Sequence, residues 1–240
     1  MRVGIIGAGN MGSAFARRLG AAGHDVFITS RDVDDAKNVA DAVAGNVRAV
    51  PQRELADQVD LMIAATPYAQ QINAIRASGS VDGKIVVEIS NPLTPDMSGL
   101  AVGHTTSAAE EVAKSVPVAR VVKAFNTVFA QVLGSGSAPN APRVQVFYAG
   151  DDDNAKSSVR ALIESMGFEP VDAGPLRHAR YLEPLGMLNI YFGYMAKMGT
   201  DIALSVRKIS AQGDEARTGA AAREQSTKRV REEEERPPAG

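Results

Sequence analysis

Short runs of apolar residues recur along the chain, and stretches with apolar positions at helical spacing separate most of them. The runs predict buried strands and the stretches predict the helices that cover them. The expected strands span residues 2–6, 25–28, 47–50, 60–65, 85–89, 120–125, 144–148 and 169–171. The expected helices span residues 13–22, 32–44, 53–57, 68–77, 107–114 and 155–166. This alternation predicts an α/β protein with a Rossmann-type, doubly wound and mostly parallel sheet.

The pattern changes toward the end of the chain. Residues 177–206 carry apolar and aromatic side chains on several faces, which is too apolar for a helix that water surrounds. We expect a small helical C-terminal cap that covers a cleft or packs on a second subunit. Residues 207–240 are rich in charge and nearly free of large apolar side chains, so we expect a mobile, disordered tail. The expected division is a Rossmann domain over 1–145, a cap over 146–206 and the tail over 207–240.

Composition narrows the possible functions. The 240 residues include no cysteine, which excludes disulfides, thiolate catalysis and cysteine metal sites. The formal net charge of −2 argues against a general affinity for nucleic acid or an anionic membrane. No apolar run approaches the roughly 20 residues that span a bilayer, and Met1 leads straight into the first strand, so we expect a cytoplasmic protein. Residues 151–153 are three aspartates, which we assign to capping of the following helix by Asp152 or Asp153 rather than to a metal site.

The first expected strand, turn and helix surround the sequence Gly-Ala-Gly-Asn-Met-Gly at residues 7–12. A glycine pattern between a strand and a helix, followed by a second strand, is the fingerprint of a dinucleotide-binding site. Its glycines allow a tight turn, close approach of the backbone to a pyrophosphate, and close packing of the helix on the strand. The first N–H groups of the helix then bind the phosphates. The expected cofactor contacts here are Gly7, Gly9, Asn10, Met11 and Gly12.

The end of the second strand indicates which dinucleotide binds. NAD sites place an acidic residue there to accept hydrogen bonds from the ribose, whereas this chain has Ser30 and Arg31. A guanidinium can bind a 2′-phosphate through two hydrogen bonds, and a hydroxyl can add one more. Lys37 on the next helix is a third candidate contact. These residues favour NADP(H) over NAD(H).

Two further strand ends carry polar side chains. Ligands of open α/β sheets bind at the carboxyl ends of the strands. Thr66 and Gln70 follow the fourth strand, and Asn91 and Thr94 follow the fifth. We expect the first pair to face the cofactor and the second pair to lie near its nicotinamide half. Asn91 and Thr94 have an alternative role as turn residues that bond to their own backbone.

Five motifs together resemble one family. They are the glycine motif at 7–12, Thr-Ser-Arg at 29–31, Ala-Thr-Pro at 65–67, Val-Lys-Ala-Phe-Asn-Thr at 122–127 and Asp-Ala-Gly-Pro-Leu at 172–176. The set, over residues 1–204, is similar to the NADPH-dependent coenzyme F420 reductases and related small dinucleotide-binding oxidoreductases. The resemblance implies a cap that contributes to a deazaflavin pocket, a homodimer, the NADP contacts named above and one more at Ala130. Two positions depart from the family: Asn126 replaces a His that faces the deazaflavin, and the Asn91-Pro92 turn differs.

The resemblance implies an NADP-dependent oxidoreductase that transfers a hydride between NADP(H) and an F420-type deazaflavin. Hydride transfer between two rings needs little acid–base chemistry from the protein, so we assign no catalytic residue and expect Asn126 and Tyr181 to flank the substrate. One alternative is an NADPH-dependent reductase of an imine, ketone or flavin, with Tyr181 or Lys123 as proton donor. A second is a non-catalytic NADP sensor that docks through its tail. Hydroxyacid and pyrroline-type dehydrogenases need a longer helical domain than the chain provides.

Overall fold

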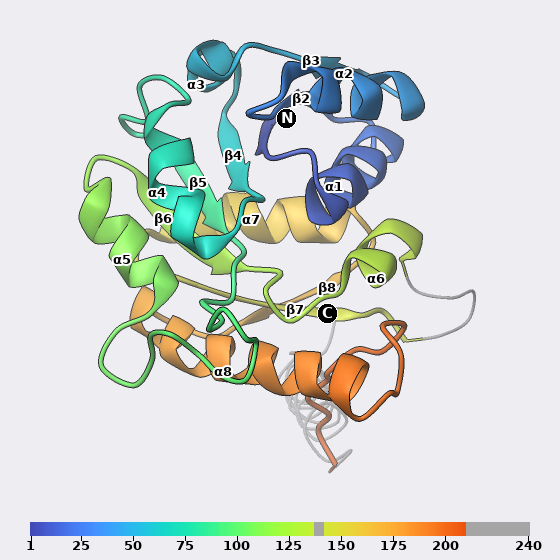
Figure 1. Cartoon of the computed structure of the whole chain (residues 1–240), viewed down its shortest axis with the longest axis vertical. Helices are drawn as coiled ribbons and strands as arrows, with labels where there is room; N and C mark the ends of the chain where they lie inside the picture. Colours follow the sequence, from blue (N-terminus) through green and yellow to red (C-terminus); the bar gives the residue numbers. More distant parts are fainter. Residues whose placement is uncertain (137–141, 210–240) are drawn as a thin grey trace, which may run out of the picture. The chain divides into compact units, whose positions relative to one another are not determined.

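The computed structural model describes residues 1–136 and 142–209. Eight strands form one sheet in the order β3-β2-β1-β4-β5-β6-β7-β8 (Figure 1). Neighbouring strands are parallel except β6 and β7, which are antiparallel. The strands are β1 (Arg2–Ile6), β2 (Asp25–Thr29), β3 (Val47–Ala49), β4 (Leu61–Ala64), β5 (Ile85–Glu88), β6 (Arg120–Ala124), β7 (Gln145–Gly150) and β8 (Glu169–Asp172). The predicted Rossmann-type α/β fold is confirmed.

Helices cover both faces of this sheet. They are α1 (Asn10–Ala21), α2 (Val33–Ala42), α3 (Leu55–Gln58), α4 (Tyr68–Arg76), α5 (Ala108–Ser115), α6 (Ala130–Ser135), α7 (Asp153–Ser165) and α8 (Ala179–Ile190), with 3₁₀ turns η1 (Gln52–Glu54) and η2 (Leu176–His178) and a π-helical segment η3 (Tyr191–Met195). One apolar core lies under α1, α2, α6 and α7, and a second lies under α3, α4 and α5. Because both faces are covered, β4 and β5 are buried along their whole length.

Local chemistry explains where the helices begin. The Asp152 carboxylate accepts a hydrogen bond from the Ala155 N–H at 2.7 Å, so Asp152 is the N-cap of α7. The Asp151 carboxylate accepts from the Leu176 N–H at 2.8 Å. The aspartate run therefore has the structural role assigned to it. Within the described residues, no group of three or more His, Asp or Glu side chains is arranged to hold a metal ion.

Three features depart from the predicted elements. Helix α1 begins at Asn10, three residues before the expected start, so the second half of the glycine motif is helical. Helix α6 occupies Ala130–Ser135, where residues 134 and 135 read as part of a Gly- and Ser-rich loop. The apolar segment 177–206 is helical through α8 and η3 and then continues without regular structure. Figure 1 shows α8 running along β7 and β8.

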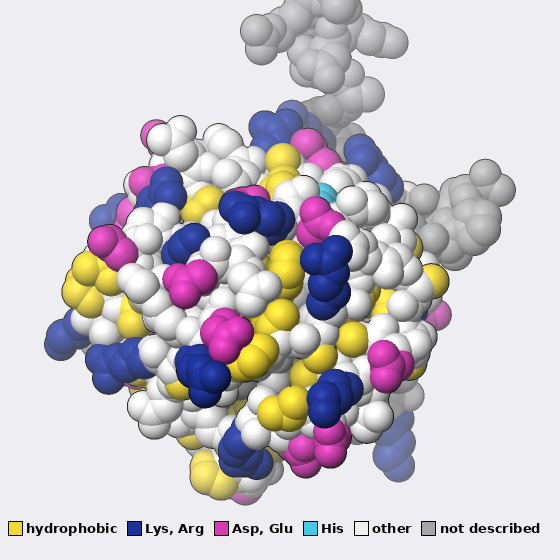
Figure 2. All heavy atoms as spheres, turned by 90° about the horizontal axis from the view of Figure 1, so that it is seen from above, with side chains coloured by type: hydrophobic (Ala, Val, Ile, Leu, Met, Phe, Trp, Pro, Cys, Tyr) yellow, Lys and Arg dark blue, Asp and Glu magenta, His cyan; other side chains and the backbone are white. Residues whose placement is uncertain are grey.

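Residues 1–205 form one compact unit that contains the whole sheet. Apart from residues 207–209, the expected tail lies outside the described residues. None of the described helices combines the length and the apolar character that a membrane crossing requires. On the face shown in Figure 2, Lys and Arg side chains are interspersed with Asp and Glu rather than gathered in one basic area.

Candidate functional site

The turn after β1 brings helix α1 very close to the sheet. Gly7 has φ +112°, and its N–H donates to the Thr29 carbonyl at 2.8 Å. A Cβ on Gly7 would lie 2.6 Å from the Ala65 carbonyl oxygen, and a Cβ on Gly12 would overlap the Gly7 carbonyl oxygen. Gly9 differs, because a Cβ there would meet nothing within 4 Å. Two glycines thus serve packing, and the third leaves open space before the helix.

The N-terminus of α1 has the properties of an anion site. Gly9 is its N-cap and offers no side-chain hydrogen bond, and no acidic residue lies in the first turn. The first N–H groups of a helix have no partner inside the helix, and the helix dipole favours a negative charge there. The open space at Gly9 therefore faces donors that suit a phosphate group.

A first cavity of about 570 Å³ lies between this turn, the end of β2 and helix α4. Six predicted cofactor contacts line it: Gly7, Gly9, Ser30, Arg31, Thr66 and Gln70. Arg31 is exposed and forms no ion pair with the described residues. Its neighbour Asp32 is engaged as N-cap of α2, where it accepts from the Asp34 N–H at 3.0 Å. The cavity thus offers a free guanidinium at one end and a helix N-terminus at the other.

A second cavity of about 650 Å³ adjoins the first and shares Gly9 and Thr66 with it. Its other walls come from the first turn of α1, from the turn after β5 and from Ile190 at the end of α8. The lining is largely apolar and includes Met11, Ile89, Leu93, Pro95 and Ile190. The Thr66 hydroxyl oxygen is buried and has no hydrogen-bond partner within the described part of the chain. Such a pocket suits a flat ring system with few polar groups.

A third cavity, of about 270 Å³, lies between α8 and the residues that connect β6 to α6, and it is lined by Asn91, Asn126 and Ala130 among others. The Asn126 amide donates to Asn91 Oδ1 at 2.9 Å and to the Leu182 carbonyl at 2.7 Å. The Asn91 amide donates in return to the Asn126 carbonyl at 2.8 Å. Only the Asn126 Oδ1 atom is buried without a partner among the described residues of this pair. Asn126 and Asn91 thus hold each other and α8, and one acceptor atom is left for a ligand.

Two details hold this amide pair in place. A Cβ on Gly186 of α8 would lie 2.5 Å from Asn91 Oδ1, so only glycine allows α8 to approach so closely. Phe125 has φ +60°, a left-handed conformation that is unfavourable for a bulky residue. Its buried ring packs edge-on against Phe15 of α1 at 5.0 Å and against Phe168 at 6.5 Å. This turn directs Asn126 toward α8.

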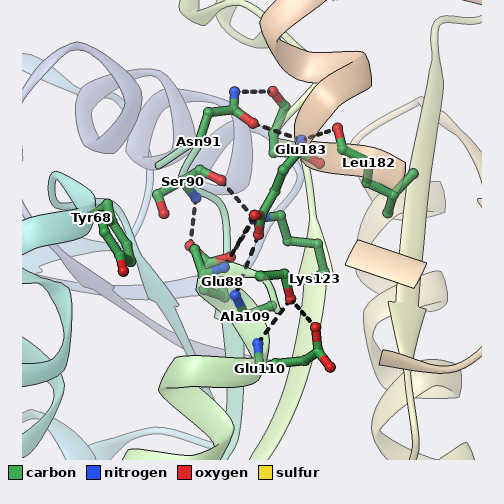
Figure 3. A network of polar contacts seen from close by, with 12 residues as sticks. Tyr68, Glu88, Ser90, Asn91, Ala109, Glu110, Lys123, Leu182 and Glu183 are labelled. Atoms are coloured by element: carbon green, nitrogen blue, oxygen red, sulfur yellow. Dashed lines mark hydrogen bonds and ion pairs between the residues drawn. The ribbon is translucent and has the colours of Figure 1, made fainter. Parts of the chain in front are cut away.

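A buried ion network contacts the turn after β5, which lines the second cavity (Figure 3). The Lys123 ammonium lies 2.5 Å from a Glu88 oxygen and 2.8 Å from a Glu183 oxygen, and all three side chains are fully buried. Burial raises the pKa of the Glu183 carboxyl, and the positive charge of Lys123 opposes that rise. Lys123, one of the two proton donors considered for the alternative reductase, lines none of the three cavities, and its ammonium is enclosed by acceptors of the protein.

Four predicted site residues lie outside these three cavities, and one of them, Gly12, is buried where α1 packs on the turn. Lys37 forms an exposed ion pair with Asp34 at 3.1 Å. Thr94 donates from its hydroxyl to the Asp96 carboxylate at 2.6 Å. The same hydroxyl accepts from the Gly99 N–H at 3.2 Å, which is the bond to its own turn that its position left open. Tyr181 is 70% exposed and packs against the His178 ring. The roles predicted for Lys37, Thr94 and Tyr181 in ligand binding therefore stay predictions.

Sequence reasoning did not identify several lining residues. The first cavity also contains Gln52 and Asn73, and the third contains Asn189 of α8. Asn189 donates to the Thr127 carbonyl at 3.1 Å, and its Oδ1 is buried with no partner in the described chain. These residues come from helices with no motif of their own, so only the fold shows that they line the cleft.

Comparison with known proteins shows what the chain is similar to. Residues 2–92 match the family model described as NADP oxidoreductase, coenzyme F420-dependent. The F420-dependent NADP reductase of Methanothermobacter marburgensis is 27% identical over 206 residues, which cover 79% of this chain and 91% of that protein. A crystal structure of a candidate F420-dependent NADP reductase from an Arthrobacter species superimposes with a TM-score of 0.77, at 26% identity over 86% of this chain and 99% of that one. Residues 2–92 thus match the NADP oxidoreductase family, and the chain is similar to F420-dependent NADP reductases over most of its length.

Another similar protein is not an F420 reductase by name. Metalloreductase STEAP3 of Rattus norvegicus is 32% identical over 189 residues, 78% of this chain but only 37% of that longer protein. The family model ends at residue 92, so this oxidoreductase match contains the whole lining of the first cavity. Asn126, Ala130 and α8, which line the third cavity, lie beyond it.

Proposed function

We propose that this chain binds NADP(H) along the three connected cavities. The observation that carries the proposal is the order of groups along the cleft. The Arg31 guanidinium, which has no ion pair among the described residues, and the Ser30 hydroxyl suit a 2′-phosphate, and the N-terminus of α1 suits the diphosphate. The apolar second cavity then suits the nicotinamide ring. The unpartnered Thr66 and Asn126 oxygens are acceptors for polar groups of the same ligand.

The bound nicotinamide would supply the hydride, and an F420-type deazaflavin is the proposed second substrate. The chain's part is to hold two rings in contact and to keep water away. Met11, Leu93 and Ile190 provide apolar walls for this purpose. No acid or base at the reacting atoms is required, in keeping with the enclosure of Lys123 and the outward position of Tyr181.

The test is oxidation of NADPH by the purified protein with three kinds of acceptor: a deazaflavin, flavin mononucleotide and simple cyclic imines. The absorbance of the reduced nicotinamide reports turnover. Turnover of the deazaflavin alone supports the proposal. A protein that binds NADPH but turns over none of the acceptors is a nucleotide sensor rather than an enzyme, and absence of NADPH binding refutes the proposal altogether.

A second candidate is reduction of another small acceptor, such as an imine, ketone or flavin. The observation that favours it is the state of Asn126. Its amide N–H groups are both used within the protein, and the side chain is buried, whereas the F420 reductases that the chain resembles place a His toward the deazaflavin. Preferential turnover of one of the other acceptors in the same assay decides for this reading.

We also propose that two copies associate through α8. Tyr181, Leu188, Tyr191 and Met195 are exposed apolar side chains at intervals of seven, three and four residues. This spacing places them in one stripe and is typical of a helix–helix seam. Sedimentation is expected to show a dimer that Leu188→Glu converts to a monomer. The control is Val118→Glu, another exposed apolar position away from the stripe; a monomeric wild type would refute the proposal.

A further inference from the structure

The Lys123 ammonium has a third partner that the two glutamates do not explain. Besides Glu88 and Glu183, it donates to the backbone carbonyl of Ser90 at 2.6 Å. An ammonium has three donors, and here each has an acceptor inside the protein. Ser90 begins the turn that forms one wall of the second cavity. The network is therefore attached directly to the cleft.

Both carboxylates extend this attachment. Glu88 accepts the Ser90 N–H at 2.7 Å through its other oxygen, so the Ser90 backbone is held at its N–H and at its carbonyl. Glu183 accepts the Ala108 N–H at 3.1 Å, at the start of α5. Figure 3 shows these groups converging from β5, β6, α5 and α8 on the Lys123 side chain. One lysine thus joins the turn after β5 to helix α8.

Stability alone does not account for this arrangement. Removing two carboxylates and an ammonium from water is costly, and apolar side chains of similar volume often stabilise a protein as well or better. Helices α5 and α8 also have a separate ion pair, between Arg180 and Glu110 at 2.6 Å. The feature particular to the Lys123 network is its hold on Ser90, whose neighbour Asn91 contacts Asn126 in the third cavity.

We propose that Lys123 is a positioning residue for the nicotinamide end of the cleft. Through Glu88 it fixes the Ser90–Asn91 turn, and through Glu183 it fixes α8, so both walls keep the separation that the ring requires. The inference rests on the proposed binding of NADP(H). It assigns Lys123 no contact with the ligand and no proton transfer.

The cleft allows a test that separates its two ends. Adenosine 2′,5′-bisphosphate carries the groups proposed for the first cavity but has no nicotinamide. NADPH has both parts and would occupy the whole cleft. Dissociation constants of both ligands are measured by calorimetry for wild type and Lys123→Met, which keeps side-chain length without the charge. We expect NADPH to bind about tenfold more weakly to the variant, the effect of losing one buried hydrogen bond to a charged group. The bisphosphate is expected to bind as before.

Two more variants make the result decisive. Glu88→Gln retains an oxygen for Lys123 but cannot accept a second N–H with its amide nitrogen, so we expect a smaller loss in the same direction. It also serves if Lys123→Met does not fold. Arg180→Ala breaks the other α5–α8 ion pair without touching Ser90, and the ratio of the two affinities should stay at the wild-type value.

The possible failures are distinguishable. A wild type that binds neither ligand refutes the proposed function and this inference with it. A wild type that binds both ligands, with Lys123→Met and Glu88→Gln leaving the affinity ratio unchanged, refutes the positioning role alone. Equal weakening of both ligands in these variants also refutes it, because a general loss of structure does not distinguish the ends of the cleft.

Discussion

Replacement of Arg31 by alanine tests the cofactor assignment directly. Arg31 lines the first cavity and has no ion pair within the described chain, so its guanidinium is available to a ligand phosphate. A charge-assisted hydrogen bond contributes about 1.5–3 kcal/mol when it is lost. Because Arg31 is exposed, screening by water places the effect near the lower end of that range. We expect Arg31→Ala to weaken NADPH binding by about tenfold, since 1.4 kcal/mol corresponds to a factor of ten.

The assay compares dissociation constants for NADPH and NADH, which differ only in the 2′-phosphate. NADH affinity should change little in Arg31→Ala, and the preference of the wild type for NADPH should decrease as salt is added. Lys37→Ala is the matched control. It removes a nearby cation that is paired with Asp34 and lies outside the first cavity, so it should leave both constants close to their wild-type values.

Two outcomes would contradict this reasoning. Equal weakening of NADPH and NADH in Arg31→Ala would show that the guanidinium does not bind the 2′-phosphate. A loss in Lys37→Ala as large as that in Arg31→Ala would show that a diffuse positive field, rather than a specific contact, selects the nucleotide.

Three further changes probe packing and protonation. Gly12→Ala should lower the free energy of unfolding by roughly 1–3 kcal/mol in denaturant titrations, because the added methyl overlaps the Gly7 carbonyl oxygen; unchanged stability would contradict the close packing. Gly186→Ala should reduce turnover while binding of adenosine 2′,5′-bisphosphate persists, because its methyl meets the Asn91 amide at 2.5 Å; normal turnover would show that α8 can shift freely. Burial, with the N-terminal ammonium, lowers the pKa of His24 below its usual 6.5. The His24 imidazole therefore binds a proton more readily in the unfolded chain than in the folded one. The stability that His24 contributes is fully present above about pH 6.5 and is lost as the pH falls through its folded-state pKa. Thermal unfolding of wild type and His24→Gln across that interval should show a smaller acid-side decrease in the variant, and parallel curves would exclude His24 as the cause.

Apolar runs were sufficient to locate the strands, because a strand buried on both faces needs apolar side chains throughout. Every strand lies within two residues of its predicted limits. The same runs carry no information about direction, so the antiparallel pairing of β7 with β6 was not predicted. Helix α6 was missed because it is short and contains Gly134, and contacts with α1 rather than its own propensity support it.

The candidate site likewise has a part that the sequence predicts and a part that it does not. The glycine turn and Arg31 follow from local sequence, because a strand–turn–helix unit fixes their geometry on its own. The acceptor end depends on pairs far apart in the chain, such as Asn91 with Asn126 and Lys123 with Glu183. Lys37 was predicted from its nearness to Arg31 in sequence, and in the structure its ammonium pairs with the Asp34 carboxylate one turn away, which would compete with a ligand. No spacing rule reveals such competition in advance.

The left-handed turn at Phe125 connects helix α1 to the Asn126 side of the cleft. Its ring is clamped by Phe15, on the helix whose N-terminus faces the proposed diphosphate, and the next residue is Asn126. A small tilt of that helix would thus be transmitted through these edge-on ring contacts to the far wall of the cleft. Substitutions at Phe15 or Phe168, which line none of the three cavities, would therefore change the position of Asn126 without removing a ligand contact.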